Sequence, residues 1–450
     1  MKKKIILLLT PCTFFLSNVA QSQIISAGES HTLSLCFDGT VKSWGNNASG
    51  QLGNNGSSNT NQPGSVNNIT NITAVSGGHE FSMALESNGN VWAWGGNAYG
   101  QLGNQTVNQQ NEPSLASISN VTAISAGYQH SLFLTSAGAL YSAGRNSEGQ
   151  LGIGSTSNTS IPTLIQSIGN VTAISAGGLH SLALKYDGTV WAWGRNNVGQ
   201  LGNGNSTDQS TPVQVSGLTG IVAISAGLYH SIALKNDGTV WCWGLNANGQ
   251  LGTGNYTDSN IPVQVTGLTS VNAIDAGYYH NIAKKTSGEV ITWGNNSNGQ
   301  IGINSTSAAF NTPQTTSVPG ALYITAGGGH CMVIENANAG WTFGANLAGQ
   351  LGEGTNTDRL IPVSFSTVCD VLSIEMKEFE NQISLYPNPV NELLKIELNN
   401  ESRIEVYSLS MTKMAESATS FNHSIDVSSF ATGIYFIKLE NGQIERFTKE

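Results

Sequence analysis

Apolar and polar residues alternate in short runs along most of the chain, and the runs recur about every 50 residues. In the clearest copy, HSLALK (180–185) and TVWAWG (189–194) alternate with the period of a half-buried β-strand. Asp187-Gly188 between them is typical of a two-residue hairpin turn. An apolar run before this hairpin and TPVQV (211–215) after it predict two more strands, the latter at an edge because it contains Pro. Four antiparallel strands in one such unit predict one propeller blade.

Seven copies of this unit can be counted. Each opens on a turn of the form AGxxH or a close variant, and Phe81 takes the His position in the second copy. The six histidines are His31, His130, His180, His230, His280 and His330. The fold class predicted is all-β, a seven-bladed β-propeller of four-stranded blades of about 50 residues, followed by a small C-terminal β-sandwich.

The loop after the third strand, WGRNNVGQLGNGN at residues 193–205, is interpreted as a rigid corner. Gly194, Asn196 and Gly199 have identical equivalents in all seven copies. Glycine permits positive φ, and asparagine tolerates the left-handed conformation and bonds to its own backbone. The loop opens no helix and carries no Lys, so phosphate binding is not expected.

The repeated histidines are interpreted as buried structural residues, each hydrogen-bonded within its own blade. Equivalent positions of a propeller lie far apart, and no acidic residue accompanies each His. No pair of carboxylates and no Ser/His/Asp set stands out either. We therefore expect no metal, no cofactor and no catalytic residue.

The third copy is expected to form the least stable blade. Ala143 stands where five copies have Trp and one has Phe. The missing aromatic would leave a gap, which Tyr141 on the same face would fill in part.

Composition excludes several classes of protein. A formal net charge of -10 disfavours nucleic acid as a partner, because phosphate binding needs a basic patch. No apolar run beyond the N-terminus reaches the roughly 18 residues of a transmembrane helix. The N-terminus itself has basic Lys2 to Lys4, an apolar stretch and small residues at Ala20 and Ser22, which predicts a secretory signal peptide over residues 1–22.

The ends of the repeat array are expected to close the ring by strand exchange. The mature chain would start at Ile24 without a preceding outer strand, and residues 360–363 would supply one. Closure would bring Cys369 near Cys36, and export permits a disulfide between them. The simpler interpretation is that the four cysteines left after cleavage are isolated thiols, since they lack metal-ligand spacing.

The repeated motifs closely resemble those of the regulator of chromosome condensation family, whose members fold as seven-bladed propellers. The resemblance spans about residues 24–365 and recurs in every copy. The founding nuclear member is a nucleotide exchange factor for a small GTPase and contacts chromatin, and an exported acidic protein has access to neither. Secreted bacterial propellers with this repeat, including the β-lactamase inhibitory protein of the second type, are similar in blade number and export. That similarity implies protein binding.

The C-terminal region differs in composition and contains short alternating strands, which predicts the β-sandwich. The segments YPNP (386–389) and GIY (433–435) resemble the C-terminal sorting domain of type IX secretion substrates in Bacteroidetes-type bacteria. The resemblance implies that residues 380–450 engage the type IX secretion machinery and are usually cleaved. An appended carbohydrate-binding sandwich is the alternative. The predicted domains are a signal peptide (1–22), a propeller (23–366), a linker (367–379) and a sorting domain (380–450).

One end of the propeller is the candidate binding face. Strands alternate in direction, so the AGxxH turns and the glycine-rich loops are expected to emerge together, carrying variable side chains on an invariant Gly and Asn frame. Tyr and Arg are typical anchors of protein interfaces. The candidate partner-binding residues are Tyr99, Tyr128, Arg145, Leu179, Arg195, Leu228, Tyr229, Leu245, Tyr278 and Tyr279. The alternative is that these side chains only cover neighbouring blades.

These observations predict a secreted or cell-surface, non-catalytic binding propeller. Its partner is expected to be an extracellular protein or a surface glycan, with no nucleic acid involved and no transmembrane segment in the chain. A propeller lyase or hydrolase with a site in the channel, and a structural adhesin, remain the alternatives.

Overall fold

The structure is a computed structural model that describes residues 24–36, 38–336, 339–366, 383–386, 390–408, 413–439 and 444–449. It divides into two compact units, Met1–Val371 and Leu372–Glu450, and each is described by itself. The predicted signal peptide (1–22) and linker (367–379) lie outside the described residues. Within the described ranges, no helix has the length and apolar character needed to cross a membrane.

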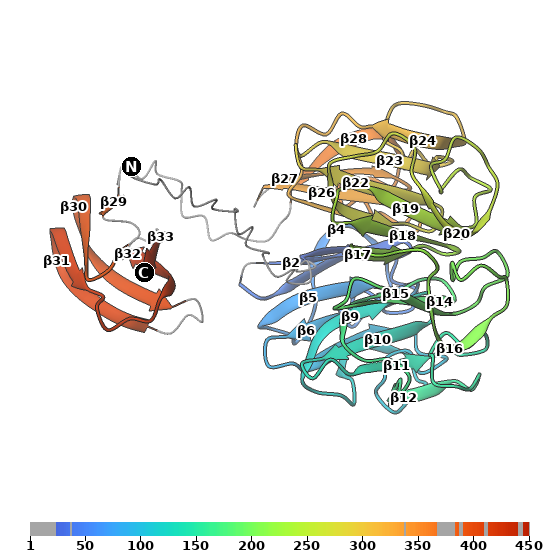
Figure 1. Ribbon diagram of the computed structural model, residues 1–450, viewed down its shortest axis with the longest axis horizontal. Helices are drawn as coiled ribbons and strands as arrows, with labels where there is room; N and C mark the ends of the chain where they lie inside the picture. The colour runs from blue at the N-terminus through green and yellow to red at the C-terminus, as the bar shows by residue number, and fades with distance from the viewer. Residues whose placement is uncertain are drawn as a thin grey trace, which may run out of the picture. The chain divides into compact units, whose positions relative to one another are not determined.

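The first unit contains seven four-stranded antiparallel sheets, as the sequence predicts, and each sheet is one blade of four consecutive strands (Figure 1). Blades 1 and 2 comprise β1 (Ile25–Ala27), β2 (His31–Leu35), β3 (Val41–Gly45), β4 (Thr60–Ser65), β5 (Ile72–Gly77), β6 (Phe81–Glu86), β7 (Val91–Gly95) and β8 (Gln110–Leu115). Blades 3 and 4 comprise β9 (Val121–Ala126), β10 (His130–Thr135), β11 (Leu140–Gly144), β12 (Thr159–Leu164), β13 (Val171–Ala176), β14 (His180–Lys185), β15 (Val190–Gly194) and β16 (Gln209–Gln214). Blade 5 comprises β17 (Ile221–Ala226), β18 (His230–Lys235), β19 (Val240–Gly244) and β20 (Ser259–Gln264). Blades 6 and 7 comprise β21 (Val271–Ala276), β22 (His280–Lys285), β23 (Val290–Asn295), β24 (Ala309–Thr315), β25 (Tyr323–Ala326), β26 (His330–Asn336), β27 (Ala339–Gly344) and β28 (Arg359–Ser366).

The ring closes without strand exchange, so that prediction is wrong. Strand β28 pairs with β27 inside blade 7, and blade 1 has its own fourth strand, β4. Every blade takes its four strands in chain order, so the first blade needs no strand before Ile24. The first blade, drawn in blue, lies beside the last blade, drawn in orange, and β1 contacts β25 (Figure 1).

Hydrogen bonds between the first strands join all seven blades. The residue before the last in each first strand accepts a bond from a backbone N–H of the next blade, as Ser125 Oγ does from Ala176 N at 2.9 Å. The other six bonds run from Gly77 to Ser26, Ala126 to Ser76, Ala226 to Ser175, Ala276 to Ser225, Ala326 to Asp275 and Ala27 to Thr325. The last of these, at 3.2 Å, spans the junction between blades 7 and 1. The junction between the last and first blades is therefore closed by the same kind of hydrogen bond as the other junctions, and not by an exchanged strand.

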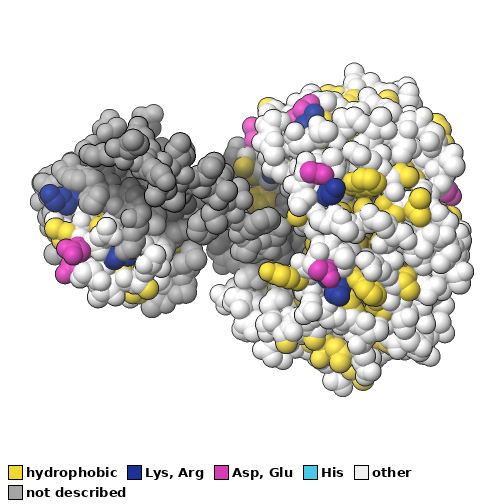
Figure 2. Space-filling model, in the orientation of Figure 1, with side chains coloured by type: hydrophobic (Ala, Val, Ile, Leu, Met, Phe, Trp, Pro, Cys, Tyr) yellow, Lys and Arg dark blue, Asp and Glu magenta, His cyan; other side chains and the backbone are white. Residues whose placement is uncertain are grey.

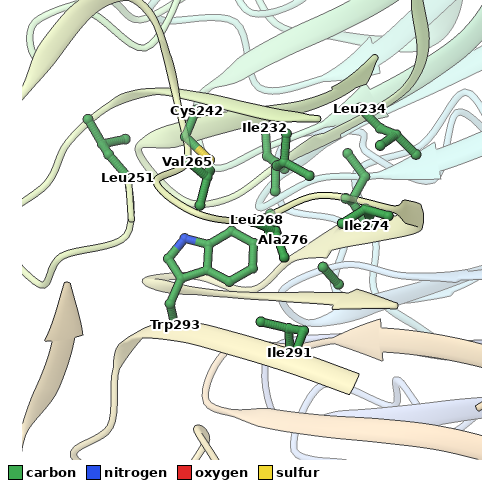
Figure 3. Packing of buried hydrophobic residues seen from close by; sticks show 13 residues of the cluster. Ile232, Leu234, Cys242, Leu251, Val265, Leu268, Ile274, Ala276, Ile291 and Trp293 are labelled. Carbon is green, nitrogen blue, oxygen red and sulfur yellow. The ribbon is translucent and has the colours of Figure 1, made fainter. Parts of the chain in front are cut away.

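The aromatic residue near the end of the third strand packs between blades. Trp293 of β23 is fully buried among Leu251, Val265 and Leu268 of the preceding repeat (Figure 3). Its Nε1 donates to the Gln250 carbonyl at 3.0 Å. Burying a tryptophan is worth about 4–6 kcal/mol as an upper bound. Each such aromatic therefore stabilises a junction rather than a single blade.

The buried histidines also cross the junctions, and their predicted placement within one blade is wrong. His180 Nε2 lies 2.9 Å from Ser231 Oγ of the next blade, and that hydroxyl donates to the Gln200 carbonyl at 2.9 Å. Neighbouring repeats meet through this pair because the blades pack face to face. Burial lowers the pKa of His180 to about 3, so the imidazole is neutral at physiological pH.

In blade 3 another aromatic residue lies where tryptophan is missing. Phe133 of β10 is fully buried and lies against Gly103, the place that Trp193 takes against Gly152 at the next junction. Phe133 and Ala143 of blade 3 are equivalent to Ala183 and Trp193 of blade 4. The large side chain is therefore on the second strand in blade 3 and on the third strand in blade 4. The aromatic that fills the gap is thus Phe133, whereas Tyr141 packs against the same cluster while half-buried.

The hairpins between second and third strands differ from the predicted two-residue turn. Lys185 N donates to Thr189 O and Gly188 N donates to Lys185 O, so the loop comprises Tyr186, Asp187 and Gly188. Gly188 has a φ of +76°, as expected for the glycine of a three-residue hairpin with a bulge. Asp187 caps the loop by accepting from the N–H and hydroxyl of Thr189.

Cys36 is disulfide-bonded, so its interpretation as an isolated thiol is wrong. Cys369, the partner that the sequence suggests, lies outside the described residues. Cys242 and Cys331 are free and buried. Cys331 takes the place of the junction serine, with its Sγ 3.1 Å from His280 Nε2.

The second unit contains one five-stranded antiparallel sheet. Its strands are β29 (Ile383–Tyr386), β30 (Leu393–Ser408), β31 (Lys413–Asp426), β32 (Gly433–Leu439) and β33 (Ile444–Lys449). Both halves of β30 contribute to one apolar core, through Leu394 and Ile396 and through Ile404 and Val406. The long strand therefore wraps around a core that is separate from those of the propeller.

Candidate binding face

The AGxxH turns and the loops between third and fourth strands lie together at one end of each blade. Arg195 N donates to Leu179 O at 2.9 Å, and Leu245 N donates to Tyr229 O at 2.9 Å. These bonds join the two segments directly, as the alternation of strand direction requires. We call the surface formed by both sets of segments the loop face.

A single asparagine organises each loop. Asn196 Oδ1 accepts from Leu201 N at 3.0 Å, and its Nδ2 donates to the carbonyls of Asn205 and Thr207. Gly199 has a φ of +81°, and a Cβ there would lie 2.5 Å from the Cα of Asn260 in the next blade. The loop is therefore fixed both internally and against its neighbour, and it is a rigid support for the side chains that vary.

Five side chains from four blades converge on the propeller axis, and we call them the axial cluster: Glu29, His79, Glu80, Tyr128 and Tyr278. The rings of Tyr128 in blade 3 and Tyr278 in blade 6 have centroids 6.1 Å apart, although their blades are not neighbours. His79 stacks on Tyr128 at 3.9 Å between centroids, and its Nε2 lies 2.7 Å from Glu29 Oε2. The turns thus meet across the mouth of the ring.

The carboxylates of Glu29 and Glu80 act on both tyrosines of the axial cluster. Burial raises the pKa of Tyr128, and the carboxylates of Glu29 and Glu80 raise it further, whereas Arg145 opposes them. The pKa of Tyr278 is also raised, first by burial and then by Glu29. The Tyr278 hydroxyl is buried and has no hydrogen-bond partner among the described residues.

Arginine and aromatic side chains form a second group beside the axial cluster. The Arg195 guanidinium lies 5.4 Å from the centre of the Tyr229 ring, and the Tyr229 and Tyr279 rings are 6.3 Å apart. Arg145 lies 5.7 Å from the centre of the Tyr99 ring. Arg145 also pairs with Glu148 at 3.1 Å. Cation–π contacts of this kind hold long side chains in place before a partner binds.

The predicted site residues fall into two groups in the structure: aromatic and arginine side chains that contact one another, and leucines that are partly or fully buried. Four of the aromatic and arginine contacts above bring together Tyr99, Tyr128, Arg145, Arg195, Tyr229, Tyr278 and Tyr279. Leu179 is buried, with 8% of its surface exposed, while Leu228 and Leu245 are half-buried. Sequence reasoning did not select His79, Glu80 or the 79% exposed Leu347. The position of His79 two residues before Phe81 was a usable signal, since it is equivalent to Tyr128.

On the propeller face that Figure 2 shows, most of the surface is uncharged. In Figure 2, lysine and arginine atoms lie beside aspartate and glutamate atoms at several places, with polar uncharged surface between them. Lys185 with Asp187, Lys235 with Asp237 and Lys285 with Glu289 are pairs of this kind. Among the described residues, no group of three His, Cys, Asp or Glu side chains has the arrangement of a metal site.

Family models match both units. Residues 4–219 match the model described as RCC1-like domain. Residues 221–250, 271–300, 237–283 and 287–334 match models described as Regulator of chromosome condensation (RCC1) repeat. Residues 384–450 match the Secretion system C-terminal sorting domain. No curated protein matches the chain.

Solved structures share the propeller fold. Human WBSCR16 is 28% identical with a TM-score of 0.62, over 68% of this chain and 84% of that chain. Yeast RCC1 (Prp20), solved with Kap60 bound, is 21% identical with a TM-score of 0.68, over 75% of this chain and 86% of that chain. Prp20p from Saccharomyces cerevisiae also matches, with 21% identity, a TM-score of 0.67, and coverage of 75% and 88%.

Proposed function

The chain joins repeats of the regulator of chromosome condensation type to a type IX secretion sorting domain, which makes it a secreted or cell-surface protein, and from this premise we propose a non-catalytic binding function. The propeller presents its loop face to an extracellular protein partner. The sorting domain brings the propeller to the compartment where that partner resides.

The observation that carries this proposal is the contrast between frame and side chains on the loop face. The frame of Asn196, Gly199 and their equivalents is the same in all blades, whereas the side chains it supports differ from blade to blade. Several of the variable positions hold Tyr or Arg, as at Tyr128, Arg195 and Tyr229, and these residue types are enriched at the centres of protein interfaces. Contacts such as Arg195 over Tyr229 reduce the side-chain entropy that binding would cost.

The absence of catalysis is part of the proposal, and the engagement of the buried polar groups supports it. The buried histidines are neutral and fully enclosed, and each Nε2 bonds to the next blade, so neither ring nitrogen can be reached by a substrate. Asp275, the acidic residue in the ring of first strands, accepts bonds from Ser225, Thr325, Ala276 and Ala326. A general base needs a free lone pair within reach of a substrate proton.

Affinity capture from culture medium and outer-membrane fractions tests the proposal. We expect the wild-type propeller to capture a protein that Arg195→Ala/Tyr229→Ala fails to capture. The matched control is Lys185→Ala/Tyr186→Ala, which also removes one cation and one tyrosine but lies at the hairpin end of blade 4, the blade that carries Arg195. Equal capture by wild type and the Arg195→Ala/Tyr229→Ala variant, with both folded, would overturn the loop face as the binding surface. Turnover of a substrate by the purified propeller would favour the enzyme alternative instead.

A further inference from the structure

The axial cluster has an excess of negative charge at the centre of the loop face. Glu29 and Glu80 flank the imidazole of His79, at 2.7 Å from Nε2 and 4.0 Å from Nδ1. Within the described part of the chain, neither carboxylate has a Lys or Arg within 4 Å. The side chains of Glu29 and Glu80 are 35% and 49% exposed, so both can be reached from solvent.

Aromatic surface borders these carboxylates. The aromatic ring of Tyr128 stacks on His79. Tyr278, which belongs to blade 6, contacts Tyr128 across the circle of blades. Blades 4 and 7 have Gly178 and Gly328 at the equivalent position and contribute no side chain. A cation beside both carboxylates and the face of a tyrosine gains from ion pairing and from cation–π attraction.

The hydroxyl of Tyr278 is a second, independent indication of a ligand. It is buried without a hydrogen-bond partner among the described residues, which is costly for a polar group. A phenolic oxygen can accept a bond from an ammonium or guanidinium N–H. Such a donor at this point would satisfy the hydroxyl and lie in the negative field of Glu29 and Glu80.

We propose that the axial cluster binds the cationic side chain of a lysine or arginine that projects from the partner protein. This inference rests on the proposed function and specifies the chemistry of the residue at the centre of the interface. The Arg195 and Tyr229 group would then contact the surrounding surface of the same partner. The proposed occupant complements the cluster in charge, because a lone acidic or apolar side chain would gain nothing from the two carboxylates.

The test uses the purified full-length protein and immobilised glycine-rich decapeptides that carry one central lysine, arginine, norleucine or glutamate. We expect saturable binding to the lysine and arginine peptides, weakening as salt is raised. Glu29→Gln/Glu80→Gln should reduce this binding at least tenfold. The control Asp187→Asn/Asp237→Asn removes the same charge at the hairpin end, and each asparagine still accepts from the following Thr. It should bind like wild type.

Two results would overturn the inference: equal binding of the lysine and norleucine peptides, or unchanged lysine-peptide binding by the folded Glu29→Gln/Glu80→Gln variant. Capture of the natural partner separates this from failure of the proposed function. A partner retained by Glu29→Gln/Glu80→Gln but lost by Arg195→Ala/Tyr229→Ala leaves the proposed function standing and rejects the axial site. A partner retained by both variants rejects the proposed function itself.

Discussion

Each buried histidine binds the next blade through Nε2 and has no partner at Nδ1. At one junction the tautomer is fixed, because Asn281 donates its Nδ2 to the Gln250 carbonyl and must accept from His230 Nε2 through Oδ1. A proton added at Nδ1 would therefore have no acceptor. Burial lowers the pKa of His31, His130, His180, His280 and His330 to about 3 and that of His230 to about 4.

Acid should therefore destabilise the propeller steeply. In the unfolded chain the pKa of histidine is about 6.5. Between that pH and about 3–4, the unfolded state therefore binds more protons than the folded state does. The free energy of unfolding should level off at pH values well above 6.5 and should fall steadily as the pH decreases through and below that value. Asp275 acts in the opposite sense, because burial raises its pKa. Urea unfolding between pH 7.5 and 4.5 checks this, and His180→Gln should lower the slope by about one proton. A flat profile would contradict it.

Ser231 offers a sharper test of a single junction. Ser231→Ala leaves His180 Nε2 and the Gln200 carbonyl without their shared hydroxyl and should cost about 1–3 kcal/mol of unfolding free energy. Ser231→Thr is the matched control, since Thr32 bonds both His330 and Gln350 O at the junction of blades 7 and 1. Equal stability of the two variants by chemical denaturation would show that the hydroxyl contributes nothing.

At the residue scale, the sequence predicts whether a side chain is buried and structural better than it predicts which residue that side chain contacts. The buried, structural character of the histidines is visible in their repetition along the chain. Their hydrogen-bond partners are not visible in the sequence. Each partner is the residue that directly follows the histidine position of the next blade, and this residue is Ser, Thr, Asn or Cys in different blades. Only the packing of blades shows that this position faces the preceding blade. For the same reason, Tyr128 and Tyr278 could be selected from the sequence, but their contact could not.

At the scale of strands, the junction between blades 2 and 3 lacks two of the usual hydrogen bonds. Phe81 replaces the histidine and Ala143 replaces the tryptophan, which leaves Ser131 Oγ donating to Gln101 O at 2.6 Å. The apolar core is nevertheless filled, because Phe133 supplies the aromatic ring. Amides of β9 to β11 should therefore exchange with solvent earlier than those of blades 4 and 5. Uniform protection in hydrogen-exchange mass spectrometry would argue against this.

Exchanging the two side chains tests the compensation directly. Ala143→Trp alone should overpack the junction against Phe133 and destabilise it by about 1–3 kcal/mol. Phe133→Ala/Ala143→Trp restores the arrangement of Ala183 and Trp193 and should recover the loss. Thermal unfolding of the two single variants and the double variant measures the coupling between the sites. Additive effects would mean that Phe133 does not occupy the place of tryptophan.

The strands themselves were largely predictable, because alternation is a local property. TVWAWG was expected and β15 runs over Val190–Gly194. The fourth strands were harder to place, since their pairing to the third strand shifts register near a proline. Every fourth strand contains one: Pro63, Pro113, Pro162, Pro212, Pro262, Pro313 and Pro362. These are the outer edges of the blades, where proline hinders pairing with another chain.

At the scale of the whole molecule, the ring is closed by repeated weak contacts between the last and first blades, and Cys36 of the first blade forms a disulfide. We expect Cys369 to be the partner, because β28 of the last blade ends at Ser366, three residues before it. Non-reducing peptide mapping should recover a Cys36–Cys369 peptide. Reduction should lower the unfolding free energy by a few kcal/mol, about the value expected when a long loop is released. Recovery of Cys36 linked elsewhere would contradict the pairing.

Strand exchange could not be decided from the sequence because closure depends on how many complete blades the chain forms. A ring closes when the last blade meets the first with the same geometry as any other pair. Here Trp44 donates to Gln350 O at 2.9 Å, as Trp193 does to Gln150 O. The seventh junction therefore has the same indole contact as the four other junctions that contain a tryptophan, and no exchanged strand is needed. The number of repeats was visible in the sequence, but this equivalence was not.

The two units have separate apolar cores, and this separation leads to the last prediction. The core of the second unit contains Leu394, Ile404, Tyr435, Phe447 and their neighbours, all from residues 390–447. Deleting residues 380–450 should therefore leave the thermal unfolding of the propeller unchanged. Because the deletion removes the sorting domain, the truncated protein should be retained in the periplasm rather than appear in the medium. The full-length Arg195→Ala/Tyr229→Ala variant is the control and should be exported normally, since its changes lie on the loop face. Normal export of the truncated protein would mean that the sorting signal lies elsewhere in the chain.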